Sequence, residues 1–308
     1  MAEPARLLLS IFTSDLLPIF LVAGVGFLVS RFVRVDVHGL ARTSLYGLAP
    51  CLIFDSLVRS TISGAEFGRM ALLCIVVTAT MGLIGRGVAL ALRLDRGALI
   101  GFLLTVMFSN GGNYGLPVVL LAFGQDALAF ATVYFVTSSV LTYTAGVSIA
   151  ASGQRTLSLA LRRVARLPTV YAVAAAGLVL ASDVTVPRPI ATAVQLLGNA
   201  ALPVMILVLG MQLERARRPS RPSVVAAATA LSLLASPAVA FAAAHLLDLS
   251  GPAFQAGIVQ ASMPTAVVTT VLALEFDVDP AFVTSVVVAS TAISPLTLTL
   301  LIAYLQNA

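Results

Sequence analysis

The chain has 308 residues, of which 59% are hydrophobic and 10% are charged, and its mean hydropathy of +1.03 is typical of a membrane protein. This composition excludes an ordinary water-soluble protein. The formal net charge of +5 does not indicate nucleic-acid binding, because every basic residue is an arginine and most lie in short loops between apolar segments. The sequence therefore predicts an all-α protein of the lipid bilayer.

Ten apolar segments approach the ~20 residues that a helix needs to cross about 30 Å of hydrocarbon. In chain order they cover residues 11–32, 38–58, 67–92, 98–124, 127–151, 167–184, 190–213, 223–247, 252–275 and 280–305. Little of the chain is left for a soluble domain. We number these segments as spans one to ten.

The arginines are distributed unevenly between the two sides of the membrane. With the N-terminus outside, fourteen of the 18 basic residues fall on the cytoplasmic side and four fall outside. Such an excess orients membrane proteins, and an even number of spans then places the C-terminus outside as well. We expect a multi-pass protein of the plasma (inner) membrane with both termini outside.

The chain contains an internal repeat with an offset of 153 residues, which separates Pro50 in span two from Pro203 in span seven. Adding this offset to the first five spans lands close to the second five. The sequence thus divides into residues 1–152, a short cytoplasmic linker at 153–166, and residues 167–308. An odd number of spans per half forces the halves into opposite orientations, so we predict two inverted five-helix repeats.

Span four contains SNGGNYGLPVV, residues 109–119, which is an unfavourable composition for a helix interior. Glycine leaves the backbone loose, and proline removes a donor and clashes with the preceding turn. Two Asn, three Gly and one Pro within eight residues exceed what a simple kink needs. We predict a functional break at Asn110, Gly111, Gly112, Asn113, Gly115 and Pro117.

Span nine has a break at its own midpoint, in QASMPTAVV, residues 260–268. Its Pro264 alone is also typical of an ordinary kink. Broken backbone in lipid costs several kcal/mol per unsatisfied group, so two breaks at matched depth predict a shared pocket near the bilayer midplane. We expect this pocket to include Asn110, Gly111, Gly112, Asn113, Met263, Pro264 and Thr265, with Pro117 and Pro264 in the first turns of restarted helices.

Few other polar residues lie within the spans. Asp55 is a candidate for coupling, because intramembrane carboxylates are functional by default, but pairing with Arg59 one turn on explains it equally well. The amide of Gln260 is a second candidate for coupling. Asp15, near the outer end of span one, is expected to be solvated. No metal-binding cluster, phosphate-binding loop or nucleophile motif is present in the sequence, which predicts neither an enzyme nor a bound cofactor.

Several motifs together resemble the auxin efflux carrier family, whose bacterial members include malonate-type transporters. The resemblance covers nearly the whole chain. It rests on LYGLAPCLIFDSL in span two, SNGGNYGLPVVLLAFG in span four, QLLGNAALPVMILVLGMQL in span seven, and QASMPTAVV with LEFDVDP between spans nine and ten.

The resemblance implies ten helices in two inverted repeats, with spans four and nine crossing at their breaks. It implies a scaffold of spans one, two, six and seven that often dimerises, and a moving transport domain of spans three to five and eight to ten. The family's crossover Asn corresponds to Asn110 or Asn113, and its crossover Pro to Pro264. By analogy we expect a homodimer through spans two and seven, where Gly47 and Gly198 would permit close helix approach, although small residues also serve packing inside a single chain.

The implied function is a secondary carrier, of the efflux type, that moves small organic anions by an elevator-like alternating-access mechanism. The sodium-coupled bile acid symporters share the general plan and use acidic and amide ligands near their crossover. This chain lacks a carboxylate in the middle of spans four and nine, although Gln255, Gln260 and Thr265 offer oxygens, so that alternative stays open. A channel or sensor would show a continuous polar stripe, whereas polar residues here concentrate at the two breaks.

Overall fold

The computed structural model describes residues 8–151, 162–182, 184–214 and 221–307, so residues 153–161 of the expected linker lie outside the described residues. Within these ranges every regular element is helical, as the composition predicted. The elements, with η marking a short π-helical turn, are η1 (Phe12–Leu16), α2 (Leu17–Phe32), α3 (Val37–Thr43), η2 (Ser44–Leu48), α4 (Ala49–Val58), α5 (Gly64–Ala91), α6 (Arg96–Met107), η3 (Gly111–Gly115), α7 (Leu116–Leu141), η4 (Thr142–Gly146), α8 (Val147–Ala150), α10 (Pro168–Ser182), α11 (Arg188–Glu214), α12 (Pro222–Ala230), η5 (Leu231–Ala235), α13 (Ser236–Leu246), α14 (Gly251–Ala261), α15 (Val268–Phe276) and α16 (Pro280–Asn307).

Four of the π-helical turns share a local cause. η1, η2, η3 and η5 each end two residues before a proline, namely Pro18, Pro50, Pro117 and Pro237. A proline inside a helix has no N–H, and its ring clashes with the carbonyl of the preceding turn. Widening that turn accommodates the ring and bends the helix without ending it.

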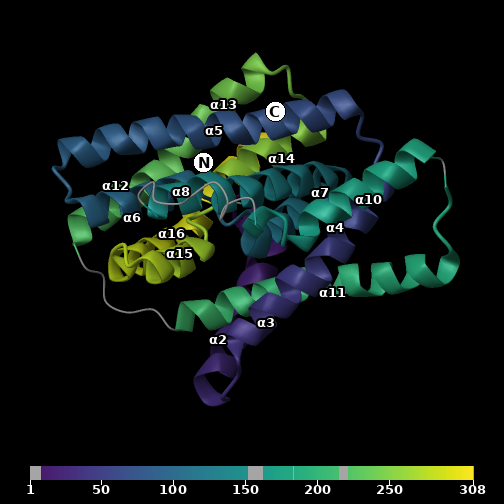
Figure 1. Cartoon of the computed structure of the whole chain (residues 1–308), viewed down its shortest axis with the longest axis horizontal. Coiled ribbons are helices and arrows are strands. Elements are labelled where there is room, and N and C mark those ends of the chain that lie inside the picture. Colours follow the sequence, from purple (N-terminus) through teal and green to yellow (C-terminus); the bar gives the residue numbers. More distant parts are fainter. Residues whose placement is uncertain (1–7, 152–161, 183, 215–220, 308) are drawn as a thin grey trace.

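The helices pack as two bundles (Figure 1). In the first bundle, α2 lies along α11, and α4 packs against both α10 and α11. In the second bundle, α5 packs against α6 and α7, α14 against α7 and α13, and α16 against α6 and α12. The first bundle consists of η1, α2, α3, η2, α4, α10 and α11; the remaining elements form the second. Contacts between the bundles involve η1, η3, α4, α7, α11 and α16.

The first bundle is held together by close helix approach at glycines. A Cβ added to Gly26 on α2 would lie 2.1 Å from the carbonyl oxygen of Leu207, and one added to Gly210 on α11 would lie 1.8 Å from that of Ala23. No side chain fits at such distances. Membrane helices pack tightly through small residues of this kind, because lipid provides no hydrophobic force to press them together.

The small residues of spans two and seven also serve packing inside the chain. A Cβ at Gly198 would lie 3.2 Å from the backbone of Leu52 on α4, and Ala49 and Ala201 are fully buried. Of the two roles that the sequence left open for Gly198, the structure therefore shows packing inside the chain, since this glycine faces a helix of its own chain. Gly47 meets no atom within 4 Å.

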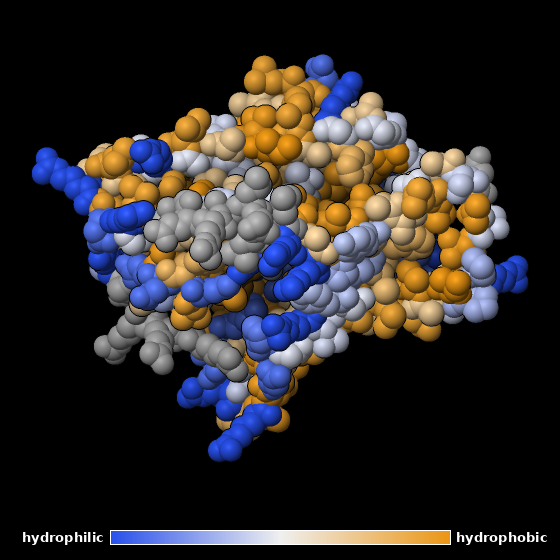
Figure 2. All heavy atoms as spheres, in the orientation of Figure 1, coloured by the Kyte–Doolittle hydropathy of each residue, from blue (hydrophilic) through white to orange (hydrophobic). Residues whose placement is uncertain are grey.

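The outer surface matches a lipid environment. Among the described residues, six helical runs have the length and composition to span a membrane, covering Leu8–Phe32, Gly64–Ala91, Gly111–Ala150, Arg188–Glu214, Pro222–Leu246 and Pro280–Asn307. Large apolar side chains point outward, with Leu83 73% and Leu178 71% exposed. Hydrophobic residues dominate much of the visible surface, and hydrophilic residues gather toward one side (Figure 2). Large exposed apolar areas of this kind mark contact with membrane.

Two interruptions shape the spans around the expected break. α6 ends at Met107, and η3 begins at Gly111. Farther along, Gly124 has φ 80° and ψ −167° inside α7, a conformation that glycine alone adopts readily. The 40-residue run Gly111–Ala150 is therefore two helical stretches joined at Gly124.

Candidate functional site

The breaks in the two spans meet. Asn110 N–H donates to the carbonyl of Pro264 at 2.7 Å, and Ala266 N–H donates to the carbonyl of Phe108 at 2.9 Å. Ser109 and Thr265 form an antiparallel bridge between these two bonds. Two helix breaks far apart in sequence thus satisfy part of each other's exposed backbone, as is required inside a bilayer. We call residues 108–110 and 264–266 the crossover.

Gln260, in the last turn of α14, ties the crossover to its surroundings. Its Nε2 donates to the carbonyls of Gly111 and Ala131, at 3.3 Å in both cases. These two acceptors determine the orientation of the amide, because a flipped amide would place its oxygen against two other oxygens. The backbone carbonyl of Gln260 also accepts a hydrogen bond from Ser109 Oγ at 2.9 Å.

The glycines of η3 make room for this glutamine. A Cβ added to Gly111 or to Gly115 would lie 2.5 Å from Gln260 Oε1. A side chain at either position would displace the amide that holds η3 against α14. The glycines that the sequence marked as a helix break are therefore required for the close approach of Gln260.

Two polar atoms at the crossover have no hydrogen-bond partner. Asn110 Nδ2 and Gln260 Oε1 are both buried and unpaired, and the two residues are 5% and 0% exposed. A buried polar atom without a partner costs about 1–3 kcal/mol, so such atoms mark a strained site or a place where a ligand or water binds. Asn110 offers a donor, and Gln260 offers an acceptor.

The remaining predicted residues lie around the same point. Met263 and Thr265 are fully buried, Pro264 and Gly112 are also buried, and Asn113 is half-buried one turn into the helix that starts at η3. Of the two candidate asparagines, Asn110 is the one whose backbone bonds to Pro264. Asn110, Pro264 and Thr265 thus lie in the crossover, and Gly111, Gly112, Asn113 and Met263 are its neighbours along the chain.

The structure separates the two prolines. Pro117 lies in the first turn of α7, as expected, but η3 precedes α7 without a gap, so the helix restarts at Gly111. Pro264 lies before α15, which begins at Val268, so the expectation that it occupies the first turn of a restarted helix is wrong. A π-helical turn accommodates Pro117, whereas Pro264 uses its carbonyl in the crossover.

Asp55 and Asp15 are the two carboxylates predicted near the outer ends of their spans, and only Asp15 differs from expectation. Asp55 Oδ1 accepts from Arg59 Nε at 2.8 Å, which is the i,i+4 ion pair that the sequence left as an alternative. Asp15 is 8% exposed, so the expectation that it is solvated is wrong. Its helix lies against the second bundle, a contact that hydropathy along the chain does not reveal.

The hydroxyl groups of Ser290, Ser294 and Tyr114, close to the crossover, were missed by sequence reasoning. Thr265 N–H bonds to Ser290 Oγ at 3.2 Å, and Thr265 Oγ1 donates to the carbonyl of Thr105 at 2.8 Å. Ser294 Oγ donates to Tyr114 Oη at 3.3 Å. Serine and threonine are common inside membrane helices, where they bond to the preceding turn, so composition gives no signal for these contacts.

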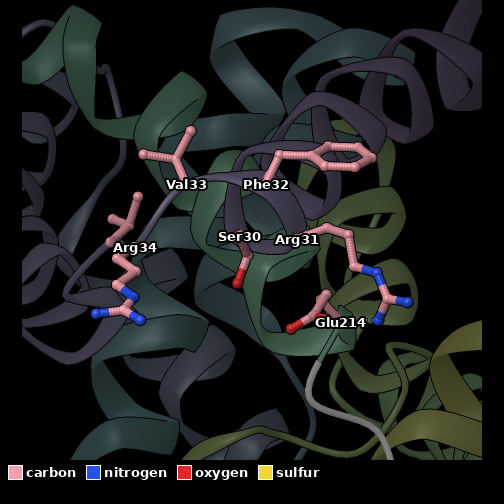
Figure 3. Close-up of a pocket in the computed structure, with 7 residues that line it drawn as sticks. Ser30, Arg31, Phe32, Val33, Arg34 and Glu214 are labelled. Atoms are coloured by element: carbon pink, nitrogen blue, oxygen red, sulfur yellow. Dashed lines mark hydrogen bonds and ion pairs between the residues drawn. The ribbon is translucent and has the colours of Figure 1, made fainter.

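A second polar feature lies at the end of α2, away from the crossover (Figure 3). A hollow of about 450 Å³ is lined by Ser30, Arg31, Phe32, Val33, Arg34, Val35 and Glu214. Arg31 reaches toward Glu214 at 3.4 Å, and its side chain is 64% exposed. An exposed pair of this kind contributes little, and the hollow contains none of the predicted site residues. Among the described residues, no group of three or more His, Cys, Asp or Glu lies close enough to hold a metal ion.

Comparison with known proteins identifies a family of membrane transport proteins. The sequence model of a family described as "Membrane transport protein" matches residues 11–159 and 152–302. The chain is 29% identical over 269 residues to an uncharacterised transporter of Methanothermobacter thermautotrophicus, covering 86% of this chain and 88% of the relative. It is 26% identical over 270 residues to an uncharacterised transporter of Methanocaldococcus jannaschii, covering 83% of this chain and 85% of the relative.

The family match covers both halves of the chain and includes the crossover. Together with the apolar helices, it makes this a multi-pass membrane protein of the transporter class. The chain therefore belongs to the auxin efflux carrier-like family of membrane transport proteins, the family that its motifs indicated.

Proposed function

We propose that this protein is a secondary transporter that carries small organic anions by alternating access, with the crossover as its substrate site. The observation that carries the proposal is the pair of unpaired buried atoms, Asn110 Nδ2 and Gln260 Oε1, beside interrupted backbone. A site with an unsatisfied donor gains stability when a ligand supplies the missing acceptor. A carboxylate oxygen is such an acceptor.

The positive end of a helix supports an anionic substrate. The stretch that begins at Gly111 continues into α7 as far as Gly124, and the N–H groups of its first turn have no intrahelical acceptor. A helix N-terminus carries roughly half a positive charge and binds anions. The centres of spans four and nine contain no arginine, so this terminus and the Asn110 amide supply the local positive potential.

The helix order supports an inverted-repeat design. Helical elements fall within each of the ten expected spans, and the breaks occur in the fourth and the ninth. We infer ten spans in two inverted repeats, with the first bundle as scaffold and the second bundle as the moving transport domain. The topology that we infer has both termini outside the plasma membrane, and efflux is the direction that the family resemblance implies.

We also propose a homodimer formed through the first bundle. Its helices expose large apolar side chains, including Leu28 at 53% and Leu196 at 67%, and these areas are available to lipid or to a second protomer. Glycine-mediated approach through Gly198 is not part of this proposal, because that residue packs on Leu52.

Sodium-coupled symport is the second candidate, and Gln260 is the observation that favours it. Its unpaired Oε1 is an acceptor, which a cation or a water molecule would satisfy and a carboxylate would not. Sodium dependence separates the two functions. If binding of the organic anion requires sodium, the symporter is the correct reading.

A thermal-shift screen of the purified protein against carboxylates, with and without sodium, tests the proposal. A ligand that binds the folded state raises the melting temperature by mass action. We expect Asn110→Ala to weaken binding roughly tenfold to a hundredfold, the effect of losing one hydrogen bond to a charged ligand. Asn199→Ala, at an exposed position on α11, is the matched control. Normal binding by Asn110→Ala, or equal binding of neutral amide analogues, would contradict an anion site at the crossover.

A further inference from the structure

A hydrogen-bonded contact joins the two bundles away from the crossover. Gln306 Nε2 donates to Asp15 Oδ2 and to the carbonyl of Ala122, at 3.1 Å in both cases. Ser14 Oγ donates to the other carboxylate oxygen of Asp15 at 2.8 Å. Because an amide nitrogen carries two hydrogens, the single side chain of Gln306 holds η1, α7 and α16 together. We call Asp15, Ala122 and Gln306 the clasp.

The clasp lies at the boundary between the bundles. Asp15 belongs to η1 of the first bundle, whereas Ala122 and Gln306 belong to the second, and η1 contacts both α7 and α16. Asp15 is buried, but Gln306 is exposed. Both polar groups can therefore be hydrated when the bundles separate, which makes this contact easier to open than interlocked leucines.

One helical stretch connects the clasp with the crossover. It begins at Gly111 and passes Ala122 before it is interrupted at Gly124, a length of roughly 17 Å at the rise of an α-helix. Ala122 lies in the last turn before that interruption, where carbonyls lack an intrahelical donor. Gln306 supplies the donor, so a movement of this stretch at the clasp displaces its other end at the crossover.

We propose that the clasp is a gate contact, which holds the two bundles together at one end in the described conformation and opens during each transport cycle. This inference rests on the proposed function, because only alternating access requires the bundles to shift. Asp15 and Gln306 are then positioning residues, and they act on the substrate through the helical stretch that starts at the crossover.

The first test needs no substrate. In a background with Cys51 and Cys74 replaced by alanine, Asn113→Cys reports access of a water-soluble thiol reagent to the crossover. Gln306→Leu removes both donors of the clasp, and we expect labelling to become roughly three- to tenfold faster, as loss of ordinary hydrogen bonds implies. Asn307→Leu is the matched control, because among the described residues the Asn307 side chain bonds only within α16, to the carbonyl of Ala303. Equal labelling rates in the two variants would overturn the gate.

The second test locks the clasp. Asp15→Cys with Gln306→Cys, in the cysteine-free background without the Asn113 reporter, is bridged by a short bifunctional thiosulfonate reagent in proteoliposomes that exchange radiolabelled malonate. We expect malonate exchange to stop when the two cysteines are bridged and to return after reduction. The reagent should leave the exchange rate of either single cysteine variant unchanged. Undiminished exchange by the bridged protein would contradict the proposal. If the unbridged protein exchanges no malonate, the proposed function is in question for that anion, and the labelling rates alone decide the role of the clasp.

Discussion

Asn110 and Gln260 show why single polar residues matter in an otherwise apolar interior. Each is more than nine-tenths buried and leaves one polar atom without a partner. In a low-dielectric setting such an atom is costly, and the same setting strengthens any hydrogen bond that it makes to a ligand. A ligand at the proposed site would therefore gain from pairing with these two atoms.

Gly115 gives a prediction at this scale. Gly115→Ala places a Cβ 2.5 Å from Gln260 Oε1, so the amide must move and lose its bonds to the carbonyls of Gly111 and Ala131. We expect a free energy of unfolding lower by about 1–3 kcal/mol, as for other overpacked cores, measured as a reduced midpoint of thermal unfolding in detergent.

The control for this prediction is Gly87→Ala. Gly87 lies in α5 with no atom within 4 Å of an added Cβ, and alanine is favoured over glycine in a helix by roughly 0.5–1 kcal/mol. This control should be neutral or stabilising. Equal midpoints for the two variants would mean that Gly115 does not define the packing of Gln260.

At the scale of elements, the ends of three helices are joined by ion pairs. Asp95, which precedes α6, accepts from Ala98 N–H at 3.0 Å and from Arg221 at 3.0 Å. Arg221 precedes α12 and also lies 3.9 Å from Asp279, just before α16. These loops connect helices of the second bundle. The contacts therefore hold together the ends of helices that must move as one unit in the proposed mechanism.

The pKa of Asp95 makes this arrangement testable by pH. The Ala98 N–H and then the Arg221 guanidinium hold the pKa of this carboxyl below its ordinary value. A carboxyl with a lowered pKa stabilises the folded state above its ordinary pKa of ~3.9, and the contribution is lost as the pH falls through the lowered value. We expect Asp95→Ala to melt at a lower temperature than the native protein at neutral pH, with the difference disappearing under acidic conditions.

Asp95→Asn separates the contribution of the helix cap from that of the ion pair. Asparagine still caps a helix but carries no charge to attract Arg221. Its melting temperature should fall between those of the other two proteins at neutral pH. A difference between native protein and Asp95→Ala that persists unchanged to low pH would show that the charge of Asp95 has no part in stability.

For the whole molecule, orientation in the membrane is the main prediction. The arginine excess places the segment after α2 inside and the segment before α14 outside. Arg34 and Ser250 lie in these two segments, and both are exposed. In a cysteine-free background, an impermeant thiol reagent added to intact cells should label Ser250→Cys and spare Arg34→Cys. The opposite pattern would reverse the topology, and lysed cells, in which both sites label, provide the control.

The sequence by itself determined the membrane class, the helical character of the chain and the location of both breaks. These follow from composition and from the local rules for glycine, proline and apolar length, which act along the chain. The motifs also identified the family, while the ten spans and the matched depth of the two breaks stay predictions.

Only the tertiary structure decided how these residues meet. Gln260 faces Gly111 and Gly115, Gly198 packs on Leu52, and Asp15 is buried beneath Gln306. Each of these contacts joins segments far apart in sequence, and in an interior where most residues are apolar, periodicity does not tell which helix face meets protein and which meets lipid. The error at Pro264 has the same physical reason, because the carbonyl of this residue accepts a hydrogen bond from Asn110, which lies far away in the sequence.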